Sequence, residues 1–164
     1  MSMTPSTPDL CDRFGDLLQV AEPRFRDYGG TASFAGTIET LKVFEDNALV
    51  RRVLESPGRG RVLVVDGDGS LRCALVGGRL AALAADNDWR GVVVHGAVRD
   101  AAELAAAPTG IKALALSPRK SGKAGTGVQG APVSFAGVTF MPGHFLWADV
   151  DGIVVAERDL TLSS

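Results

Sequence analysis

The segment Gly91-Val-Val-Val-His-Gly-Ala-Val-Arg-Asp100 decides the fold class of this 164-residue chain. Its apolar, β-branched start is typical of a strand that is covered on both faces of a sheet. The stretch that follows, Asp100-Ala-Ala-Glu-Leu-Ala-Ala-Ala107, has the pattern of a helix start. A strand that leads directly into a helix predicts a βαβ unit, and ligands of α/β proteins collect where such strands end. Arg99 and Asp100 therefore stand at a candidate binding site.

Two segments upstream predict further strands of the same sheet. Arg61-Val-Leu-Val-Val-Asp66 is a short apolar run, as expected of a central strand. Leu75-Val-Gly-Gly-Arg-Leu80 passes from a strand around Val76 into an alanine-rich helix. The N-terminus of that helix and the N-terminus of the helix after Asp100 are expected to face one pocket.

The remaining segments complete a mixed α/β domain. Further predictions are a helix from Thr7, as its N-cap, to Gly15; a strand over 34–44 with an irregularity near Gly36; a helix over 48–54; a strand over 112–116; and β segments over 133–135, 138–140, 145–148 and 153–156. The turn Ala136-Gly137 has the spacing of a hairpin. The fold class is a single α/β domain, residues 1–164, with a βαβ core and antiparallel additions. Its polar, proline-containing start, residues 1–6, is expected to be disordered.

Composition and charge disfavour several classes of function. Hydrophobic residues make up 46% of the chain and charged residues 22%, the balance of an ordinary globular domain. The formal net charge of -2 gives no basic footprint for a phosphate backbone, which disfavours direct nucleic-acid binding and leaves a protein partner possible. No apolar run approaches the roughly 18 residues that a membrane span needs. Cys11 and Cys73 lack a paired spacing, so a reducing cytoplasm is the simplest location.

Arg99, Asp100 and Glu103 each have a functional and a structural interpretation. The planar guanidinium of Arg99 can bind a substrate carboxylate through two parallel hydrogen bonds, or it can pair with Asp100. The pattern Asp100-Ala-Ala-Glu103 matches a capping box, and the cap is the favoured interpretation of Asp100. A capping carboxylate stays ionised, so a free oxygen could still hold a hard cation or its bound water. Glu103 lies one turn further along the same face and could assist.

Three other features of the sequence also have more than one interpretation. Gly77-Gly78 offers bare N–H groups at a positive helix end for a carboxylate or enolate oxygen, although tight strand-to-helix geometry explains these glycines equally well. His95 could face the pocket as an acid or a base, but two isolated histidines, His95 and His144, argue against a catalytic zinc site. The segment Arg119-Lys-Ser-Gly-Lys123 could contact an acidic partner or supply an imine-forming lysine, and a solvated loop is the commoner explanation.

The loop Asp66-Gly-Asp-Gly-Ser70 is a weak match to two known motifs. As a nucleotide-binding loop it lacks the third glycine of Gly-x-Gly-x-x-Gly, which is replaced by Arg72. As a calcium loop it places Gly77 where a bidentate Glu belongs. Nucleophilic hydrolysis is not supported either, because Ser121 and Cys73 show no visible partnership with a histidine.

Several motifs taken together identify a family resemblance that extends from Thr7 to about Leu160. They are Thr7-Pro-Asp-Leu-Cys-Asp12, Phe44-Glu-Asp-Asn47, Gly60-Arg-Val-Leu-Val-Val-Asp-Gly67, Gly96-Ala-Val-Arg-Asp100, Gly137-Val-Thr-Phe140 and Asp151-Gly-Ile-Val154. The chain resembles the family of the regulator of ribonuclease E activity A, which includes 4-hydroxy-4-methyl-2-oxoglutarate aldolases. The resemblance implies a compact fold of the swivelling β/β/α type, assembled as a ring-shaped homotrimer. It also implies cleavage of 4-hydroxy-2-oxo acids to pyruvate, and oxaloacetate decarboxylation, with a divalent cation such as Mg²⁺ or Mn²⁺.

The resemblance also assigns roles to individual residues. It implies that the segment Gly77, Gly78, Arg79 and Leu80 binds the carboxylate end of a small 2-oxo acid through backbone groups. Arg99 and Asp100 are its catalytic residues, of which Arg99 binds the substrate and Asp100 holds the metal. Many aldolase members carry Asp at the position of Gly78. The alternative implied by the family is a non-catalytic regulator that binds and inhibits ribonuclease E, and the intact Arg99-Asp100 pair favours the enzyme.

Overall fold

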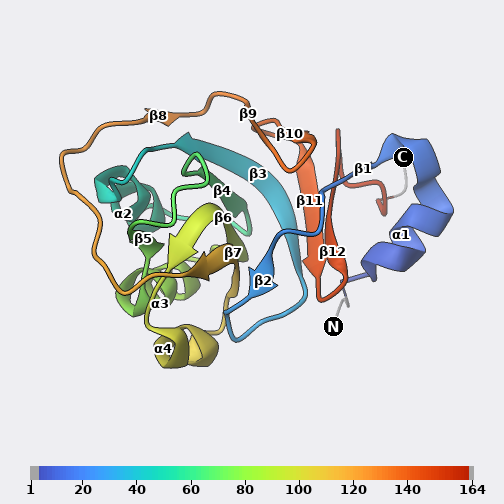
Figure 1. Cartoon of the computed structure of the whole chain (residues 1–164). Coiled ribbons are helices and arrows are strands. Elements are labelled where there is room, and N and C mark those ends of the chain that lie inside the picture. Colours follow the sequence, from blue (N-terminus) through green and yellow to red (C-terminus); the bar gives the residue numbers. More distant parts are fainter. Residues whose placement is uncertain (1–3, 163–164) are drawn as a thin grey trace.

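The computed structural model of the chain describes residues 4–162, which form a mixed α/β domain around a curved sheet (Figure 1). The helices are α1 (Thr7–Phe14), η1 (Gly15–Leu17), α2 (Ala48–Glu55), α3 (Gly78–Asp86) and α4 (Ala101–Ala106). The parallel strands are β3 (Phe34–Lys42), β4 (Val62–Asp66), β5 (Ala74–Val76), β6 (Gly91–Val98) and β7 (Gly110–Leu116). The antiparallel additions are β1 (Gln19–Val20), β2 (Arg26–Asp27), β8 (Val128–Gln129), β9 (Val133–Phe135), β10 (Val138–Phe140), β11 (Phe145–Asp149) and β12 (Gly152–Ala156). The predicted α/β class with its parallel βαβ core is confirmed.

The order of the sheet explains where ligands can bind. Its strands run in the order β1-β12-β11-β3-β4-β6-β7-β2, and β5 pairs with β6 beyond the end of β4. Helix α2 connects β3 to β4, α3 connects β5 to β6, and α4 connects β6 to β7. The carboxyl ends of β5 and β6 therefore lie next to the N-termini of α3 and α4, as expected for a pocket between the two connections.

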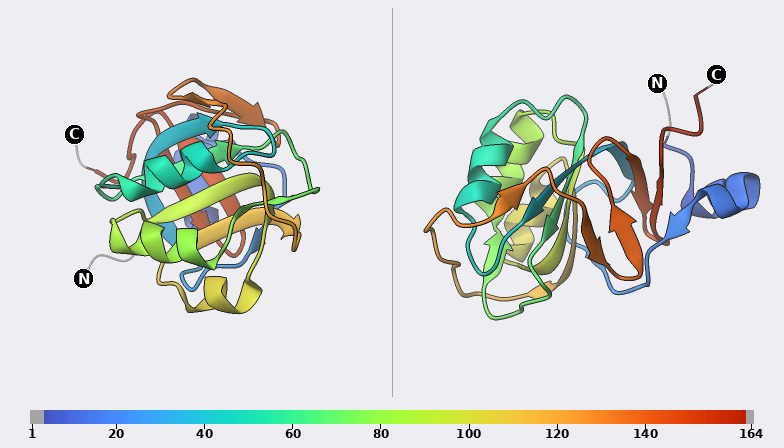
Figure 2. Two further views of the ribbon diagram at one scale, coloured as in Figure 1. Left: turned by 90° about the vertical axis from the view of Figure 1, so that its left-hand side faces the viewer. Right: turned by 90° about the horizontal axis from the view of Figure 1, so that it is seen from above.

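Strand β4 shows why its apolar run has no polar alternation. Leu63 and Val65 pack in the core on the helical side of the sheet, with residues of α2, α3 and α4. Val62 and Val64 pack in a second core against β9, β10, β11 and β12. All four side chains are fully buried. Figure 2 shows these layers, with α2 and α3 on one side of the parallel strands and the antiparallel strands on the other.

Helix α1 packs on β11 and β12 rather than on the parallel strands, in a third small core formed by Leu10, Trp147 and Val154.

None of the helices within residues 4–162 has the length and apolar character that a bilayer crossing requires.

The start of α1 differs from the prediction by one residue. Ser6, not Thr7, is the N-cap, and its Oγ accepts the N–H of Asp9 at 3.2 Å. Thr7 instead donates its N–H and its hydroxyl to the carboxylate of Asp149, at 2.7 and 2.8 Å. The local sequence pattern around Thr7 does not indicate Asp149 as its partner, because the two residues are 142 positions apart. Of the start that we expected to be disordered, residues 1–3 lie outside the described residues, whereas Ser6 takes part in the helix cap.

Two predicted backbone features have different outcomes. The hairpin of β9 and β10 is confirmed, and both turn residues, Ala136 and Gly137, have positive φ angles of 51° and 74°. This is the turn geometry that matches the twist of two-residue hairpins. Strand β3, in contrast, continues through Gly36 as one nine-residue strand. Glycine is needed at position 36 because a Cβ atom at that position would overlap the carbonyl oxygen of Gly60.

Candidate functional site

A cleft of about 480 Å³ opens where β5 and β6 end and where α2, α3 and α4 begin. It lies at the carboxyl ends of parallel strands, the usual ligand position in α/β proteins. Six residues singled out at the two strand-to-helix connections line this cleft: Gly77, Arg79, Leu80, Arg99, Asp100 and Glu103. The structure therefore brings together both strand-to-helix connections, as predicted. Gly78, in the first turn of α3, is buried and does not line the cleft.

Asp100 does not cap the helix that follows it. Its backbone is left-handed, with φ 66° and ψ 54°, and its side chain makes no hydrogen bond to α4. The capping-box prediction is therefore wrong, because an N-cap residue needs extended backbone to reach its own helix. The Oδ2 atom of Asp100 instead accepts the N–H of Gly78 at 2.9 Å, at the start of α3. A side chain on Gly77 would begin only 2.7 Å from Oδ2, which accounts for glycine at that position.

Glu103 occupies the space beside Gly78. A side chain on Gly78 would overlap the carboxylate of Glu103, and the nearest atom would be Oε2. The family resemblance implies an Asp at the position of Gly78 in many aldolase members, and Glu103 brings a carboxylate beside that position. Within residues 4–162, Glu103 makes no side-chain hydrogen bond and no ion pair. Its carboxylate is available for a ligand.

Arg99 and Asp100 do not pair with each other, although they are adjacent in the chain. The guanidinium of Arg99 donates from Nη1 to the carbonyl oxygen of Pro118 at 3.4 Å, a weak contact. Within the described part of the chain, Arg99 forms no ion pair. The structural alternative, an Arg99–Asp100 ion pair, is therefore not found. The remaining N–H groups of the half-buried guanidinium can bind a carboxylate through two parallel bonds.

The basic segment 119–123, for which a solvated loop was the commoner explanation, forms one wall of the cleft. Lys120, Ser121 and Lys123 line it together with residues of α3 and α4. Asn47, at the N-cap position of α2, and Arg51 of α2 also line it. Asn47 belongs to the motif Phe44-Glu-Asp-Asn47 but was given no role, and Arg51 was not singled out from the sequence. No local pattern identifies these residues, because the contact depends on how the segment after β7 returns across the sheet.

His95 is not a member of the cleft, and the prediction that it faces the pocket is wrong. It lies on β6 at the end of β4, where its Nδ1 is 3.1 Å from Oδ1 of Asp66. Its ring stacks on Phe135 with centroids 4.5 Å apart. Lys42 also donates to Asp66, at 3.0 Å. Burial alone would raise the pKa of Asp66, but the hydrogen bonds from His95, Asp68 and Lys42 outweigh it and lower the pKa to about 2.

The cleft fits a hydrated divalent cation better than a fully protein-bound one. Within residues 4–162, no group of three or more His, Cys, Asp or Glu side chains is arranged to hold a metal ion. The cleft does offer the carboxylates of Asp100 and Glu103. Mg²⁺ typically keeps several waters and is bound by one or two carboxylates together with the substrate. Oxygen donors of this kind therefore suit the cation that the family resemblance implies.

Known proteins resemble this chain over nearly its whole length. A family model described as RraA-like, Aldolase/RraA, matches residues 7–155. A protein of Alkalilimnicola ehrlichii named "Putative 4-hydroxy-4-methyl-2-oxoglutarate aldolase" is 56% identical over 158 residues, which is 96% of this chain and 98% of the relative.

Two solved structures are similar in fold and in sequence. The crystal structure of an S-adenosylmethionine: 2-dimethylmenaquinone methyltransferase from Geobacillus kaustophilus has a TM-score of 0.94 and 49% identity, and the match covers 98% of this chain and 99% of that one. The structure of the RNA-processing inhibitor RraA from Thermus thermophilis has a TM-score of 0.93 and 50% identity, over 97% of this chain and 96% of that one.

Proposed function

This chain belongs to the RraA-like family, and on that basis we propose that it is a divalent-metal-dependent carbon–carbon lyase. Its proposed reaction is the cleavage of 4-hydroxy-4-methyl-2-oxoglutarate, the substrate named for its relatives, with release of pyruvate. Oxaloacetate decarboxylation is the second proposed activity. The observation that carries the proposal is that carboxylates and cations share one cleft without pairing among themselves, so both kinds of charge are available to a ligand.

Both reactions need the same stabilisation. Breaking the bond between C3 and C4 of either substrate leaves its electron pair on C3, as the enolate of pyruvate. The negative charge that develops must be stabilised by groups already in place. Arg99 and the N-terminus of α3 supply such groups from the two connections that form the cleft.

The first turn of α3 is suited to the carboxylate next to the oxo group. The first N–H groups of a helix have no partner within it, and the helix dipole makes that end positive. The N–H of Gly78 is taken by Asp100. Those of Arg79 and Leu80, which follow it in the first turn, can bind the substrate carboxylate, while Arg99 orients the same end of the molecule.

Asp100 and Glu103 have separate proposed tasks. Asp100 would hold the cation through the oxygen that Gly78 does not use. When bound, such a cation supplies positive charge that stabilises the enolate oxygen. Glu103 would accept the proton of the C4 hydroxyl at its carboxylate, because it is the cleft carboxylate without another hydrogen bond in the described chain. Decarboxylation involves no such proton.

The test follows pyruvate release from both substrates, with Mg²⁺ or Mn²⁺ and then with a chelator. The native chain is compared with Asp100→Asn, which keeps an acceptor oxygen for Gly78 but removes the charge. We expect metal-dependent release that is lost in the variant. Release that does not depend on the metal, or that Asp100→Asn leaves unchanged, would overturn the proposed site. Asp100→Ala serves as the companion variant that removes the hydrogen bond as well.

A second candidate is a regulator of RNA processing. The similarity to the RNA-processing inhibitor of Thermus thermophilis, at 50% identity, favours it. It predicts that the purified protein binds ribonuclease E and slows its cleavage of RNA. The test measures both in the same preparation, with Asp100→Asn as the control, because an outer-surface interaction would not depend on the cleft. Absence of binding would leave this candidate without support.

A methyltransferase activity, the name of the Geobacillus kaustophilus structure, is not our proposal for this chain. The loop after β4 leads into β5 rather than into a helix, so it lacks the strand-to-helix context of a nucleotide-binding glycine loop. The Asp66 carboxylate at its start is already bonded to His95, Lys42 and the N–H of Asp68.

We also propose a homotrimer, which the family resemblance implies, and a cytoplasmic location, which the spacing of the two cysteines favours. An apolar groove lined by Phe44 and Val128, whose side chains are half exposed, supports an interface between subunits. Sedimentation should therefore give a mass three times 17.1 kDa. Cys11 and Cys73 are both free, which is consistent with a reducing compartment.

A further inference from the structure

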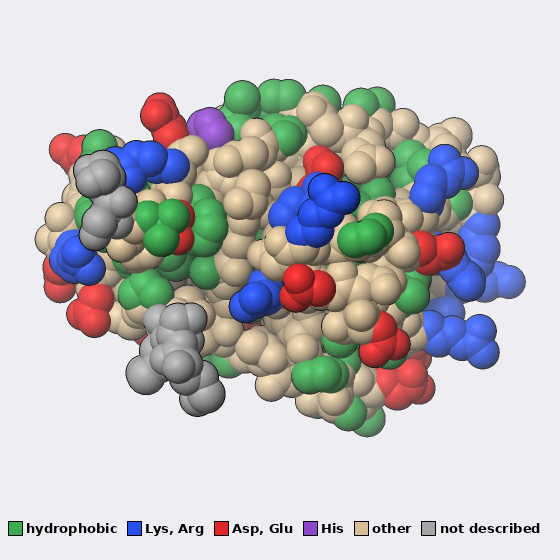
Figure 3. Space-filling model, turned by 180° about the vertical axis from the view of Figure 1, so that it is seen from behind, with side chains coloured by type: hydrophobic (Ala, Val, Ile, Leu, Met, Phe, Trp, Pro, Cys, Tyr) green, Lys and Arg blue, Asp and Glu red, His purple; other side chains and the backbone are tan. Residues whose placement is uncertain are grey.

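The cleft holds more cationic side chains than binding one carboxylate requires. Arg79, Arg99, Lys120 and Lys123 all line it, and none forms an ion pair within residues 4–162. Arg51, the fifth cation, pairs with Glu55 outside the cleft. Figure 3, from behind, shows Lys and Arg side chains gathered at the end of the molecule opposite α1. A cleft with an excess of unpaired positive charge is suited to a ligand with more than one negative group.

The two lysines lie on the segment that forms one wall of the cleft. We call residues 117–126 the strap. Its start is fixed beside Arg99, because the N–H of Ser117 donates to Val98 at 2.9 Å. Further along, the carbonyl of Arg119 accepts the N–H of Ala74 at 2.8 Å. In Figure 1 the strap runs from the end of β7 past the ends of α3 and α2.

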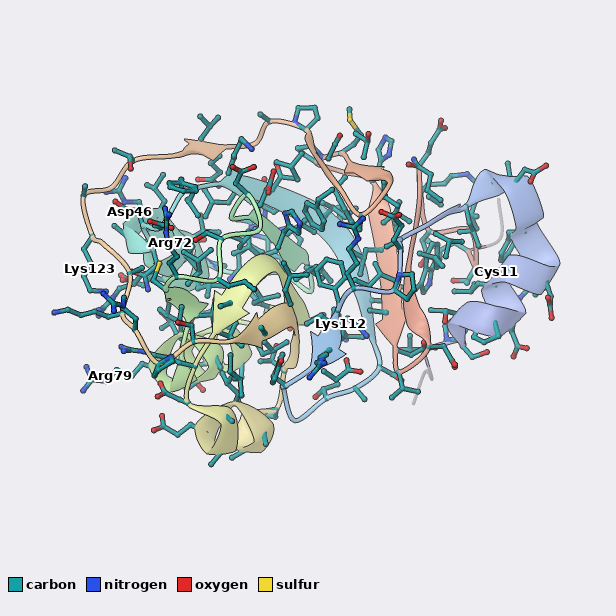
Figure 4. All side chains as sticks on the ribbon, viewed as in Figure 1. Cys11, Asp46, Arg72, Arg79, Lys112 and Lys123 are labelled. Carbon is teal, nitrogen blue, oxygen red and sulfur yellow. The ribbon has the colours of Figure 1, made fainter. Side chains whose placement is uncertain are left out.

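The far end of the strap is attached to α2. The carbonyl of Gly122 accepts the N–H of Asn47 at 3.1 Å, and Lys123 donates from Nζ to the side-chain oxygen of Asn47, also at 3.1 Å. The strap thus begins beside the strand end that carries Arg99, and it brings first Lys120 and then, next to the start of α2, Lys123. Figure 4 shows that Lys123 and Arg79 lie at the same end of the molecule although they come from different elements.

Asp46 fixes the strap in this position. Its buried carboxylate accepts the N–H groups of Ala124 and Gly125, at 2.7 and 3.0 Å, and the N–H of Ala48 at the start of α2, at 3.0 Å. Burial alone would raise the pKa of Asp46, but these hydrogen bonds lower it, so the carboxylate stays charged. A loop held by an ionised, buried acceptor keeps its lysines in place before any ligand arrives.

We infer that Lys120 and Lys123 bind the second carboxylate of the substrate, and that this pair makes the cleft selective for 2-oxo acids with a carboxylate at each end. The inference rests on the proposed lyase, because it takes the first carboxylate to lie between Arg99 and α3. The second carboxylate then lies toward α2, where the strap provides the cations. Lys123 would bind this carboxylate from its position beside Asn47, and Lys120 from its position next to Ala74, with which it forms a β-bridge.

The two proposed reactions use this second carboxylate differently. In aldol cleavage it remains charged on the departing oxo acid, so a cation that binds it stabilises substrate and transition state alike. In decarboxylation the same group loses its charge as carbon dioxide leaves, so a cation bound to it opposes the reaction. The strap lysines therefore favour aldol cleavage over decarboxylation.

The test measures binding rather than turnover. Calorimetry with Mg²⁺ present compares 2-oxoglutarate, which has both carboxylates but no hydroxyl group to start cleavage, with pyruvate, which has one. The variants are Lys120→Met, Lys123→Met and the double variant. Arg119→Met is the matched control, since Arg119 is an exposed cation of the same strap that does not line the cleft. Thermal unfolding of each variant confirms that it is folded.

We expect the double variant to lose about tenfold or more of its affinity for 2-oxoglutarate, the scale of losing a charge-assisted bond. Its affinity for pyruvate should change much less, and Arg119→Met should match the native chain for both acids. Equal losses for the two acids, no loss for 2-oxoglutarate, or no binding of 2-oxoglutarate to the native chain would each overturn the inference. If the selective loss is found but no substrate is cleaved, the lyase proposal fails and the dicarboxylate site stands.

Discussion

Asp100 and Gly78 are joined by a hydrogen bond of 2.9 Å that connects two different strand–helix connections. The carboxylate belongs to the turn between β6 and α4, and the N–H belongs to the first turn of α3. One oxygen of Asp100 thus completes the helix end that is proposed to bind the substrate carboxylate. The other oxygen remains for a cation. Asp100 therefore connects the proposed carboxylate site at the start of α3 to the proposed cation site.

This double role predicts different effects for two substitutions of Asp100. Asp100→Asn should lower metal-dependent pyruvate release roughly 100-fold, because the negative charge is lost, while an oxygen remains for Gly78. Asp100→Ala should show the same loss of activity and in addition lower the free energy of unfolding by about 1 kcal/mol, the usual value of a lost helix cap. Urea unfolding and calorimetric titration with Mn²⁺ check the two parts. Native Mn²⁺ affinity in Asp100→Asn would contradict the prediction.

The close approach of Gly78 and Glu103 predicts that even a methyl group at position 78 displaces Glu103. Gly78→Ala should lower aldol cleavage roughly 10- to 100-fold through misplacement of the carboxylate. The control is a double-mutant cycle. In a Glu103→Gly background, which removes the Cβ atom of residue 103 as well as its carboxylate, the added methyl group should have little further effect on cleavage, because the side chain it displaces is gone. Additive losses would show that the two positions act independently.

The proposed role of Glu103 predicts a separation of the two reactions. Glu103→Gln keeps the size of the side chain but cannot accept the hydroxyl proton, so the kcat of aldol cleavage should fall roughly 100-fold. Oxaloacetate decarboxylation needs no such proton and should fall much less. Steady-state kinetics with both substrates measure the ratio. An equal fall for both would indicate that Glu103 serves the cation rather than the proton.

The parallel centre of the fold could be predicted from the sequence because its signals are local. The apolar runs of β4 and β6 are long enough to identify strands covered on both faces, and the Arg99-Asp100 pair marks the end of β6. The family resemblance added the residues of α3. Periodicity and motif spacing therefore suffice for one side of the cleft.

The other side of the cleft could not be predicted, since it depends on contacts between distant segments. Asp46 and Ala124 are 78 positions apart, and nothing near either residue indicates their hydrogen bond. The capping box failed for a related reason. The left-handed backbone of Asp100 turns its side chain toward α3, and a four-residue pattern does not specify that conformation.

The Asp66 cluster predicts how stability depends on pH. The folded pKa of Asp66 is about 2, below the ordinary value of 3.8, so the charged form is favoured by folding. Its contribution is complete above pH 4 and disappears as pH falls toward 2, and the size of the shift corresponds to about 2 kcal/mol. Asp66→Asn should be less stable than the native chain at pH 6, and the difference should shrink by about that amount at pH 2. Urea unfolding at both values measures it, and a constant difference would contradict the assignment.

Asp46 positions the strap without lining the cleft. Asp46→Ala leaves the N–H groups of Ala48, Ala124 and Gly125 without their acceptor, so the free energy of unfolding should fall by about 1 to 3 kcal/mol. Because Lys120 and Lys123 are no longer held, the KM for 4-hydroxy-4-methyl-2-oxoglutarate should rise more than its kcat falls. Hydrogen exchange of the amides of 117–126 separates this effect from general destabilisation: they should exchange faster, while amides of the buried strand β4 keep their protection. Unchanged exchange in the strap, with a raised KM, would mean that Asp46 acts on the substrate by another route.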